Sequence, residues 1–486
     1  MVPATAGLPA AAPWRSSDLD GFAESALTTE GAAVATPAFH EWLADRRRQT
    51  RLTVTQIPFA ALRGWGFERD TGNLVHDSGR FFSVEGLRVQ TGRGGEVHAR
   101  WFQPIINQPE IGILGIAVKR IHGVLHCLMQ AKVEPGNANG VQLSPTVQAT
   151  LSNYTGVHQG KPVRYLDYFT DRSRGRTLVD VLQSEQGAWF YRKRNRNMVV
   201  AVDDDVEAHE DFCWLTFGQL RRLLALDDVV NMDVRTVFAC LSFEACAPLA
   251  DQPAATGDDA ARFRRALLAS LSPGAPALLT ATELLSWFTE VKTRSVVSAE
   301  RIPLAEVANW LRLPSEIRHE SGRYFSLVAV EAEAGSREVA RWTQPLLRPH
   351  GPGVVAFLAR RFGGVLHVLA HARVEPGFLD VVELAPTVQC TPGNYRHLPA
   401  AQHPPFLARV LSAPASQIRY DAVQSEEGGR FDRAQNRYMV VEIDDEPALP
   451  EDFRWLTIGQ LTGLLRHSNY LNVQARSLIA ALHSVW

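Results

Sequence analysis

The chain carries one sequence pattern twice. Residues 101–241 align without a gap on residues 342–482, so that Trp101 corresponds to Trp342 and Trp214 to Trp455. Between these anchors, Gln-Pro, Val-Glu-Pro-Gly, Pro-Thr-Val-Gln, Gln-Ser-Glu and Trp-Leu-Thr-x-Gly-Gln recur at equivalent positions of both copies. A spacing kept over so many residues indicates a duplicated domain. Each copy can therefore be read against the other as a two-sequence comparison.

The duplication divides the chain into predicted segments. A length of 486 residues with 45% hydrophobic content is enough for two cores. We predict a disordered or loosely docked head at residues 1–35, which are rich in Ala, Pro, Ser and Thr. The first repeat is predicted at 36–242, a linker with a short helix at 243–279, and the second repeat at 280–486.

Each repeat is predicted to be α+β, with a mixed sheet and flanking helices. Residues 111–119 and 354–361 are apolar and precede a second apolar segment at hairpin distance, so they are predicted strands. A helix is predicted to begin at Thr36-Pro37. Capping-box spacing marks further helix starts, and these Thr and Gln residues are therefore assigned to capping rather than to catalysis. The pairs are Thr280 with Glu283, Thr216 with Gln219, and Thr457 with Gln460.

Charge and cysteine content narrow the functional class. The chain has 50 Lys and Arg against 52 Asp and Glu, so no global basic excess favours nucleic acid or an anionic membrane. No apolar run approaches the ~18 residues of a membrane span, and the first residues lack a basic signal region. We predict a cytoplasmic protein. The five cysteines form no paired CxxC motifs, so reduced buried thiols are expected rather than a zinc site.

Residues 183–197, which align with residues 424–438, are the richest polar segment. Cations lie there beside aromatic rings, which suits a nucleoside diphosphate because guanidinium groups bind phosphate oxygens and rings stack on bases. A solvated edge strand is the simpler explanation of the spacing alone. The cations are Arg192, Lys193, Arg194 and Arg196 beside Trp189, Phe190 and Tyr191, where repeat two has Arg433, Ala434, Gln435 and Arg437 among its equivalents.

Lys132 and Glu134 form a second candidate pair. They alternate on a predicted strand, so both side chains point to one face, where they could hold a carbonyl and a proton. A salt bridge on the sheet surface explains the pattern equally well. Repeat two keeps the pairing as Arg373 and Glu375.

Some polar residues occur in one repeat only. Asn137, Gln142 and Ser144 of repeat one correspond to Phe378, Glu383 and Ala385 of repeat two. Because the fold tolerates the loss of these hydroxyl and amide groups, they are better candidates for a binding site than shared residues.

The sequence contains no motif that supports a bound metal or a nucleotide cofactor. His367 and His371 are four residues apart, as zinc ligands on a helix often are, but the repeat places them on a strand. We therefore interpret them as core histidines. No GxGxxG motif follows a strand and no GxxxxGK[ST] motif occurs, so neither a Rossmann nor a P-loop site is predicted.

The longest shared motifs resemble those of the NDP-hexose 2,3-dehydratases of deoxysugar biosynthesis. The resemblance covers nearly the whole chain from about Phe39, both repeats included. The motifs are Trp101-Phe-Gln-Pro-Ile-Ile-Asn-Gln-Pro-Glu110, Gln130-Ala-Lys-Val-Glu-Pro-Gly-Asn137, Leu143-Ser-Pro-Thr-Val-Gln-Ala149, Ser152-Asn-Tyr154 and Gln183-Ser-Glu-Gln-Gly187.

The resemblance implies a fold and a reaction. It implies two Nudix-like modules without the Nudix metal box, assembled as a homodimer. The substrate would be dTDP-4-keto-6-deoxyglucose, which would lose its C2 hydroxyl to give a 3,4-diketo-2,6-dideoxy sugar for a partner 3-ketoreductase, in antibiotic biosynthesis. Neither a redox cofactor nor a metal is needed if cations or amides hold the enolate.

Residue type and strand direction then suggest roles within that reaction. Lys132 would polarise O4, Glu134 or Glu185 would act as base, and Tyr191 as acid or donor. The predicted substrate-binding residues are Trp101, Gln130, Asn137, Ser144, Ser152, Asn153, Tyr154, Ser184, Trp189, Arg192, Lys193, Arg194, Asn195 and Arg196, with Trp189 or Tyr154 near thymine. A second nucleotide site, either degenerate or the catalytic one, would comprise Arg373, Glu375, Tyr395, Ser425, Glu426, Arg430, Arg433, Asn436 and Arg437.

Two alternatives stay open from the sequence. A dTDP-sugar-binding or scaffold protein without catalysis would bind the nucleotide sugar and leave it unchanged. A Nudix-type pyrophosphohydrolase would need a divalent metal and would release a nucleoside monophosphate, so full activity in EDTA would exclude it.

Overall fold

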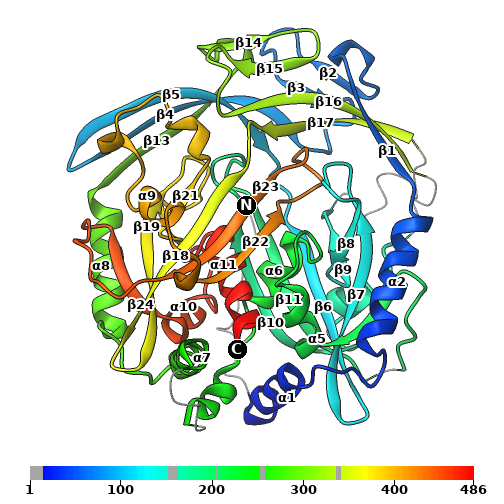
Figure 1. The fold of residues 1–486 in the computed structure, drawn as a ribbon. Helices are drawn as coiled ribbons and strands as arrows, with labels where there is room; N and C mark the ends of the chain where they lie inside the picture. The colour runs from blue at the N-terminus through cyan, green and yellow to red at the C-terminus, as the bar shows by residue number, and fades with distance from the viewer. Residues whose placement is uncertain (1–14, 152–161, 204, 252–257, 335–340) are drawn as a thin grey trace, which may run out of the picture.

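The computed structural model describes residues 15–151, 162–203, 205–251, 258–334 and 341–486. Within these residues, two seven-stranded mixed sheets lie side by side and two five-stranded antiparallel sheets lie together at one end of the molecule (Figure 1). The two halves have the same strand order, which confirms the predicted α+β duplication. The Nudix-like description of each repeat stays a prediction.

Each seven-stranded sheet has one parallel strand pair among antiparallel ones, β11 with β6 in repeat one and β23 with β18 in repeat two. The strands of repeat one are β6 (Gly112–Ile121), β7 (Val124–Val133), β8 (Val141–Ser144), β9 (Val147–Ala149), β10 (Arg176–Ser184), β11 (Arg194–Ala201) and β12 (Phe212–Thr216). Those of repeat two are β18 (Gly353–Phe362), β19 (Val365–Val374), β20 (Val382–Ala385), β21 (Val388–Cys390), β22 (Ile418–Ser425), β23 (Gln435–Glu442) and β24 (Phe453–Thr457). The predicted hairpins correspond to β6 with β7 and β18 with β19.

The five-stranded sheets exchange strands between the repeats. Strand β1 (Leu52–Ile57) of repeat one pairs with β16 (Phe325–Ala334) of repeat two, and β13 (Ser295–Ile302) of repeat two pairs with β4 (Ser83–Arg93) of repeat one. The remaining strands are β2 (Trp65–Phe67), β3 (Leu74–His76), β5 (Glu96–Asn107), β14 (Trp310–Arg312), β15 (Glu316–His319) and β17 (Arg341–Pro349). The two repeats therefore interlock through backbone hydrogen bonds.

Helices flank the sheets and fill the space between them. The α-helices are α1 (Ser16–Leu27), α2 (Thr36–Gln49), α4 (Asp167–Thr170), α5 (Phe217–Leu223), α6 (Met232–Phe238), α7 (Asp259–Ser270), α8 (Ala281–Arg294), α9 (Leu407–Leu411), α10 (Ile458–Leu464) and α11 (Val473–Leu482). The 3-10 turns are η1 (Phe59–Ala61), η2 (Glu244–Asp251), η3 (Leu304–Glu306), η4 (Pro392–Asn394), η5 (Ala400–Gln402), η6 (Ala415–Gln417) and η7 (His483–Val485). All three predicted capping boxes are confirmed, at the N-termini of α5, α8 and α10. None of the helices described is long and apolar enough to cross a membrane.

Helix α1 lies in the segment 1–35 that was predicted as a disordered or loosely docked head, and within the described residues 15–35 it is packed against repeat one. Phe22 is fully buried and meets Phe217 edge-on, with ring centroids 5.8 Å apart. The Ser25 hydroxyl donates to the Leu125 carbonyl at 2.6 Å and accepts from the Phe217 amide at 2.9 Å. The sequence pattern hid this helix because small residues form much of its buried face.

Helix α7 takes the same place in repeat two as α1 in repeat one, although it lies in the segment predicted as a linker. Phe263 is 2% exposed, and the Ser270 hydroxyl accepts from the Ile458 amide at 2.8 Å, as Ser25 accepts from Phe217. The segment is therefore more than a tether, because its helix belongs to the core of repeat two.

Helices α6 and α11 pack against each other at the centre of the molecule, between the two large sheets (Figure 1). Each sends a buried arginine across to the other repeat. Arg235 of α6 donates to the Ser425 carbonyl at 2.7 Å, and Arg476 of α11 donates to the Ser184 carbonyl at 2.5 Å. These reciprocal bonds fix the ends of β10 and β22, and each of those ends leads into a loop that reaches the other repeat.

A buried carboxyl beside this centre gives a test of stability. Glu383 accepts a hydrogen bond from the Ser184 hydroxyl at 2.5 Å, where the equivalent Gln142 accepts from Ser425 at 2.8 Å. Burial raises the pKa of Glu383 to about 8 from 4.5. Between these two values the folded protein keeps a proton that the unfolded chain releases, so stability falls as pH rises through this window.

We expect Glu383→Gln to remove this pH dependence, because a glutamine can accept the Ser184 bond without ionising. The free energy of unfolding at pH near 8 should rise by on the order of a few kcal/mol, with little change below the lower end of the window. Urea denaturation of both proteins at the two pH values measures the difference. A variant less stable than wild type at the higher pH would contradict it.

Candidate active site

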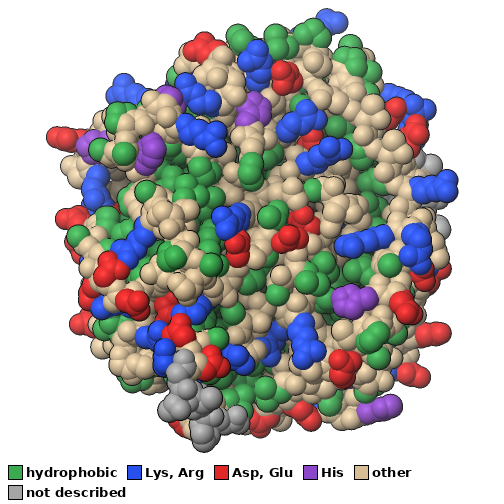
Figure 2. Space-filling view, viewed as in Figure 1, with side chains coloured by type: hydrophobic (Ala, Val, Ile, Leu, Met, Phe, Trp, Pro, Cys, Tyr) green, Lys and Arg blue, Asp and Glu red, His purple; other side chains and the backbone are tan. Residues whose placement is uncertain are grey.

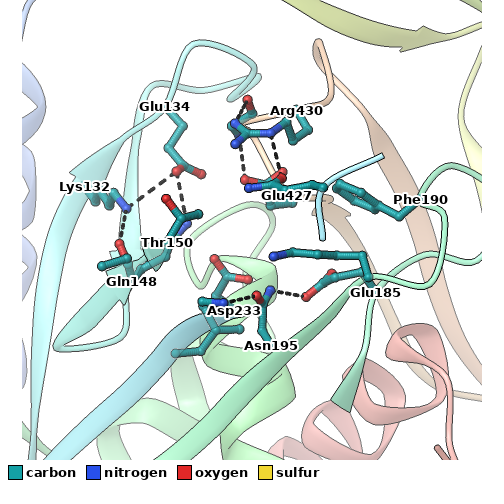
Figure 3. A pocket seen from close by; sticks show the side chains of 16 residues that line it. Lys132, Glu134, Gln148, Thr150, Glu185, Phe190, Asn195, Asp233, Glu427 and Arg430 are labelled. Carbon is teal, nitrogen blue, oxygen red and sulfur yellow. Dashed lines mark hydrogen bonds and ion pairs between the residues drawn. The ribbon is translucent and has the colours of Figure 1, made fainter. Parts of the chain in front are cut away.

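A cavity of about 110 Å³ lies where the two repeats meet, far larger than one water molecule requires (Figure 3). Repeat one lines it with Gln108, Gly112, Leu114, Lys132, Glu134, Gln148, Ala149, Thr150, Glu185, Phe190, Lys193, Asn195 and Asp233. Repeat two adds Glu427, Gly429 and Arg430. Four carboxyl groups and three cations therefore share one small space.

One wall of the cavity holds the predicted pair at the end of β7. Lys132 Nζ lies 3.6 Å from Glu134 Oε1, and their side chains are 21% and 11% exposed. Gln148 donates its amide to the same Glu134 oxygen at 3.0 Å, and its backbone carbonyl accepts from Lys132 Nζ at 3.3 Å. The predicted pairing of Lys132 with Glu134 is confirmed, and it faces a cavity rather than open solvent.

The opposite wall has Glu185 and Asn195 (Figure 3). Lys193 also lines the cavity, and all three residues lie near the β10–β11 turn. Asn195 donates to Glu185 Oε1 at 2.7 Å, while the second oxygen of Glu185 is buried without a hydrogen bond from the described residues. Burial raises the pKa of Glu185. Burial also lowers the pKa of Lys193 to about 8, and Lys193 donates to the Glu110 carbonyl.

The third wall comes from repeat two, from the loop between β22 and β23. Glu427 Oε1 accepts from the Gly429 amide at 3.1 Å, and Oε2 is buried without a hydrogen bond from the described chain. Arg430 donates to Gln108 Oε1 at 3.1 Å and lies over the Phe82 ring at 4.3 Å. Burial raises the pKa of Glu427 to about 7, and repulsion from the nearby Glu134 carboxylate is the second largest cause.

Asp233, at the start of α6, completes the set of carboxyls. It is 3% exposed, and burial raises its pKa well above the usual value, with Glu185 and Glu427 adding to the effect. Burial and mutual repulsion among these carboxyl groups favour their protonated forms, and the pKa of Glu427, about 7, lies near neutral pH. A site that keeps both a paired carboxylate and protonated carboxyls can serve as base and acid together.

Five residues predicted for a site in repeat one line this cavity, namely Lys132, Glu134, Glu185, Lys193 and Asn195. Their catalytic and binding roles stay predictions. Arg430 was placed in a second site and lies in this one instead, because its loop crosses to repeat one. The residues that sequence reasoning missed are Gln108, Gln148, Asp233 and Glu427.

The aromatic residues proposed to contact substrate lie elsewhere. Tyr191 packs beside a small apolar cluster with Trp101, and it does not line the cavity. Trp101 donates to Gln103, which in turn holds the Ala188 carbonyl, so it has a structural role. Trp189 packs on Phe431 with ring centroids 4.5 Å apart.

The four predicted phosphate-binding cations do not converge. Arg196 makes two hydrogen bonds of 2.6 Å to Asp180 on the neighbouring strand. The Arg192 side chain lies 5.0 Å over the Tyr191 ring and is exposed, and Arg194 does not line the cavity. Lys193 lines the cavity, Arg196 is held by Asp180, and Arg192 lies in the turn before β11 at φ 52°, so these cations do not face one place in the structure.

Other predicted binding residues support the site from outside it. Ser144 donates to the cavity residue Gln148 at 2.7 Å, and Asn137 donates to Gly140 within its own turn. Ser184 is buried against Glu383, and Gln130 pairs with Ser144 across β7 and β8. The predicted contacts Ser152, Asn153 and Tyr154 lie outside the described residues.

The predicted second nucleotide site is tightly paired within the fold. Arg373 Nε lies 3.0 Å from Glu375 Oε1, and Gln389 donates to the same oxygen at 2.9 Å. Phe378 packs so closely on Gly187 that a Cβ there would lie 2.5 Å from its ring. Glu426 accepts bonds from Asn436, Tyr438 and Gln186, Ser425 donates to Gln142, and Arg437 pairs with Asp421. Arg433 lies in a turn with a φ of 50°. Tyr395 follows directly after η4.

The equivalent positions of repeat two lack most of the ionisable groups. Lys193 and Asp233 correspond to Ala434 and Gln474, and the incoming Glu427 and Arg430 correspond to Gln186 and Trp189. What the repeats share is the pair at the end of β7 and the glutamate of the Gln-Ser-Glu motif. Among the described residues, the cavity of repeat one therefore has four ionisable groups that the equivalent positions of repeat two lack.

Histidines show no cluster at this cavity. His367 and His371 lie on β19, as predicted, where His371 stacks on Phe453 at 4.2 Å and pairs with Asp452 at 3.2 Å. Among the described residues, His209, Glu210 and Asp211 lie close enough to share an ion, but both acids already pair with Arg46. We therefore do not propose a metal site at these three residues. On the face in Figure 2, Lys and Arg are interspersed with Asp and Glu.

Comparison with known proteins gives this geometry a family. The model of the NDP-hexose 2,3-dehydratase family matches residues 36–241 and 281–482. The chain belongs to this family. A relative from Saccharopolyspora spinosa is 52% identical over 98% of this chain and 97% of its own, and one from Amycolatopsis orientalis is 49% identical over 96% and 94%. Another from Streptomyces violaceoruber is 47% identical over 93% and 97%. All three are named dTDP-4-dehydro-6-deoxy-alpha-D-glucopyranose 2,3-dehydratase.

The name of the NDP-hexose 2,3-dehydratase family describes a dehydration across two neighbouring carbons of a hexose. A 2,3-dehydration removes a proton and a hydroxyl from neighbouring carbons, so it needs a base and an acid within a few ångströms of each other. The cavity offers this combination, with Glu134 on the wall of β7 and Glu427 on the loop of repeat two.

Proposed function

We propose that this chain removes water across C2 and C3 of dTDP-4-dehydro-6-deoxyglucose, and that the reaction takes place in the cavity between the repeats. The observation that carries the proposal is the cavity's chemistry, in which the ion-paired Glu134 and Lys132 share one small space with buried carboxyls. The names of relatives about 50% identical over nearly their full length support the same substrate.

The C4 ketone makes this reaction accessible to side chains alone. It acidifies the proton on C3, whose removal places negative charge on O4. Loss of the C2 hydroxyl as water then leaves a C2–C3 enol, which becomes the C3 ketone. The product is a 3,4-diketo-2,6-dideoxy sugar with no net oxidation, so the protein must supply a base at C3, a cation or donor at O4, and an acid at the C2 hydroxyl.

Glu134 is the better base of the two candidates. Its carboxylate is paired with Lys132 and accepts from the Gln148 amide, which suits an ionised group. Glu185 accepts instead from the Asn195 amide, and burial raises its pKa, so its ionised form is less favoured than that of an exposed glutamate. Lys132 lies beside Glu134 and can stabilise the negative charge that develops on O4.

Loss of water is the direct test. The purified chain is incubated with dTDP-4-dehydro-6-deoxyglucose, with and without a 3-ketoreductase and NADPH, and the sugar nucleotide is followed by mass spectrometry. We expect the mass of one water to be lost, and the reductase to trap a stable product. Unchanged substrate in both reactions would favour the alternative of a binding or scaffold protein.

The setting of the reaction is part of the proposal. A 3,4-diketone is reactive, which supports functional coupling to a 3-ketoreductase that reduces it on release. Lys193 and Arg430 are the cations nearest the cavity that suit the diphosphate. We further propose cytoplasmic location and a homodimer, which cell fractionation and light scattering would test.

A further inference from the structure

We propose that Glu427, supplied by repeat two, is the general acid that protonates the departing C2 hydroxyl in the site of repeat one. This inference rests on the proposed dehydration. It makes the active site composite, because neither repeat contains both the base and the acid. The second repeat would then be a working half of the enzyme rather than a copy that only completes the fold.

Backbone contacts hold the loop of Glu427 against repeat one. Gly136 donates to the Gly428 carbonyl at 2.7 Å, and Arg433 donates to the Gly136 carbonyl at 2.8 Å. A Cβ at Gly136 would lie 1.7 Å from the Phe431 carbonyl oxygen, so the contact requires glycine there. Gln344 fixes the next residue by donating to the Gly429 carbonyl at 2.8 Å. These backbone and side-chain contacts fix the position of the loop that carries Glu427.

The equivalent loop of repeat one shows which features of the Glu427 loop the fold needs and which it does not. There Gly377 donates to the Gly187 carbonyl at 2.7 Å and Arg192 donates to the Gly377 carbonyl at 2.7 Å, so the clasp is the same. The residue in the place of Glu427 is Gln186, whose amide donates to Glu426 Oε2 at 2.8 Å. The loop therefore forms without a carboxyl at this position. A carboxyl present only where the loop meets Lys132 and Glu134 points to chemistry.

The surroundings of Glu427 suit an acid. One oxygen accepts from the Gly429 amide, and the other is buried without a hydrogen bond from the described residues, free for a substrate hydroxyl. Burial and the carboxylates Glu134 and Glu185 raise its pKa to about 7, against the opposing effect of Arg430 and Lys132. Lys193 and Asp233 complete the charged groups that line the cavity. Near neutral pH a large fraction of Glu427 therefore carries a proton.

The step balances within the site. Glu134 takes the C3 proton, the C2–O bond breaks with its electron pair on oxygen, and Glu427 gives a proton to that oxygen, so water leaves. The enol then moves one proton from its C3 oxygen to C2. Glu134 ends protonated and Glu427 ionised, and a net transfer of one proton from Glu134 to Glu427 restores the starting state.

A substrate that needs no acid distinguishes this role from a structural one. Fluoride leaves as a stable anion, so an analogue with fluorine in place of the C2 hydroxyl needs the base but not the acid. We expect Glu427→Gln to lower the rate of water loss about 10²- to 10⁴-fold and to change the rate of fluoride release by less than about tenfold. Wild-type water loss should fall as pH rises through about 7, where Glu427 loses its proton, and fluoride release should not.

The outcomes are separable. Loss of both reactions in Glu427→Gln would assign Glu427 a structural role, and retention of both would remove it from catalysis; either result overturns the proposal. If wild type loses both water and fluoride and Glu427→Gln does so equally fast, the proposed dehydration stands and the acid is another group. If wild type releases neither water nor fluoride, the proposed function itself fails.

Discussion

Replacing Glu134 by glutamine is expected to lower the rate of water loss from dTDP-4-dehydro-6-deoxyglucose about 10²- to 10⁴-fold, the range usual for removal of a general base. The amide has nearly the same shape as the carboxylate but cannot accept the C3 proton. Release of fluoride from the C2-fluoro analogue should fall by a similar factor, because that reaction needs the same deprotonation. Single-turnover rates measured by mass spectrometry for both substrates give the two factors.

Repeat two offers a matched control for this variant. Glu375 has the same partners as Glu134, since Arg373 and Gln389 approach it as Lys132 and Gln148 approach Glu134. We expect Glu375→Gln to keep turnover within about threefold of wild type, because Glu375 does not line the cavity between the repeats. Full activity in Glu134→Gln together with loss in Glu375→Gln would move the catalytic site to repeat two.

Much of the fold was readable from the duplication and from local chemistry. Capping-box spacing located three helix starts, and apolar segments at hairpin distance located the central strands. The exchange of β1 and β13 was not predictable, because similar repeats build similar sheets and either sheet would accept either strand. Only the path of the connections decides between them. Helix α1 was missed because its buried face is short and small.

In the candidate site, too, local sequence predicted some features, and contacts between the repeats determined the others. Alternation on β7 predicted that Lys132 and Glu134 share a face, since strand geometry is local. Glu427 and Arg430 were beyond such reasoning because they reach the cavity from the other repeat. One signal was present: Glu427 aligns with Gln186 and Arg430 with Trp189, so polar groups found in only one copy included those of repeat two. Within the basic segment, strand pairing places Arg196 against Asp180 while Lys193 lines the cavity, a difference that the spacing of the cations did not predict.

Replacing Lys132 by methionine is expected to lower turnover about 10²- to 10³-fold, the loss typical when one preorganised charge at a developing oxyanion is removed. Methionine keeps the length and the apolar stem of lysine but cannot stabilise negative charge on O4. Because the enolate forms before either leaving group departs, water loss and fluoride release should fall together. An effect on water loss alone would place Lys132 at the C2 hydroxyl instead.

The same substitutions in repeat two test whether the pair at the end of β7 acts by its chemistry or by its packing. Arg373→Met leaves the buried carboxylate of Glu375 without its cation, so it should cost roughly 3–5 kcal/mol of stability while turnover per folded molecule stays near wild type.

Lys132→Arg tests whether a different cation can replace lysine in repeat one. In repeat two the arginine lies 3.0 Å from its glutamate, against 3.6 Å for the lysine of repeat one. A guanidinium fork held on Glu134 in this way would occupy the base, so Lys132→Arg should stay at least tenfold below wild type despite its charge. Wild-type activity in Lys132→Arg would show that any cation suffices there, and loss of turnover only in Arg373→Met would reverse the assignment of the repeats.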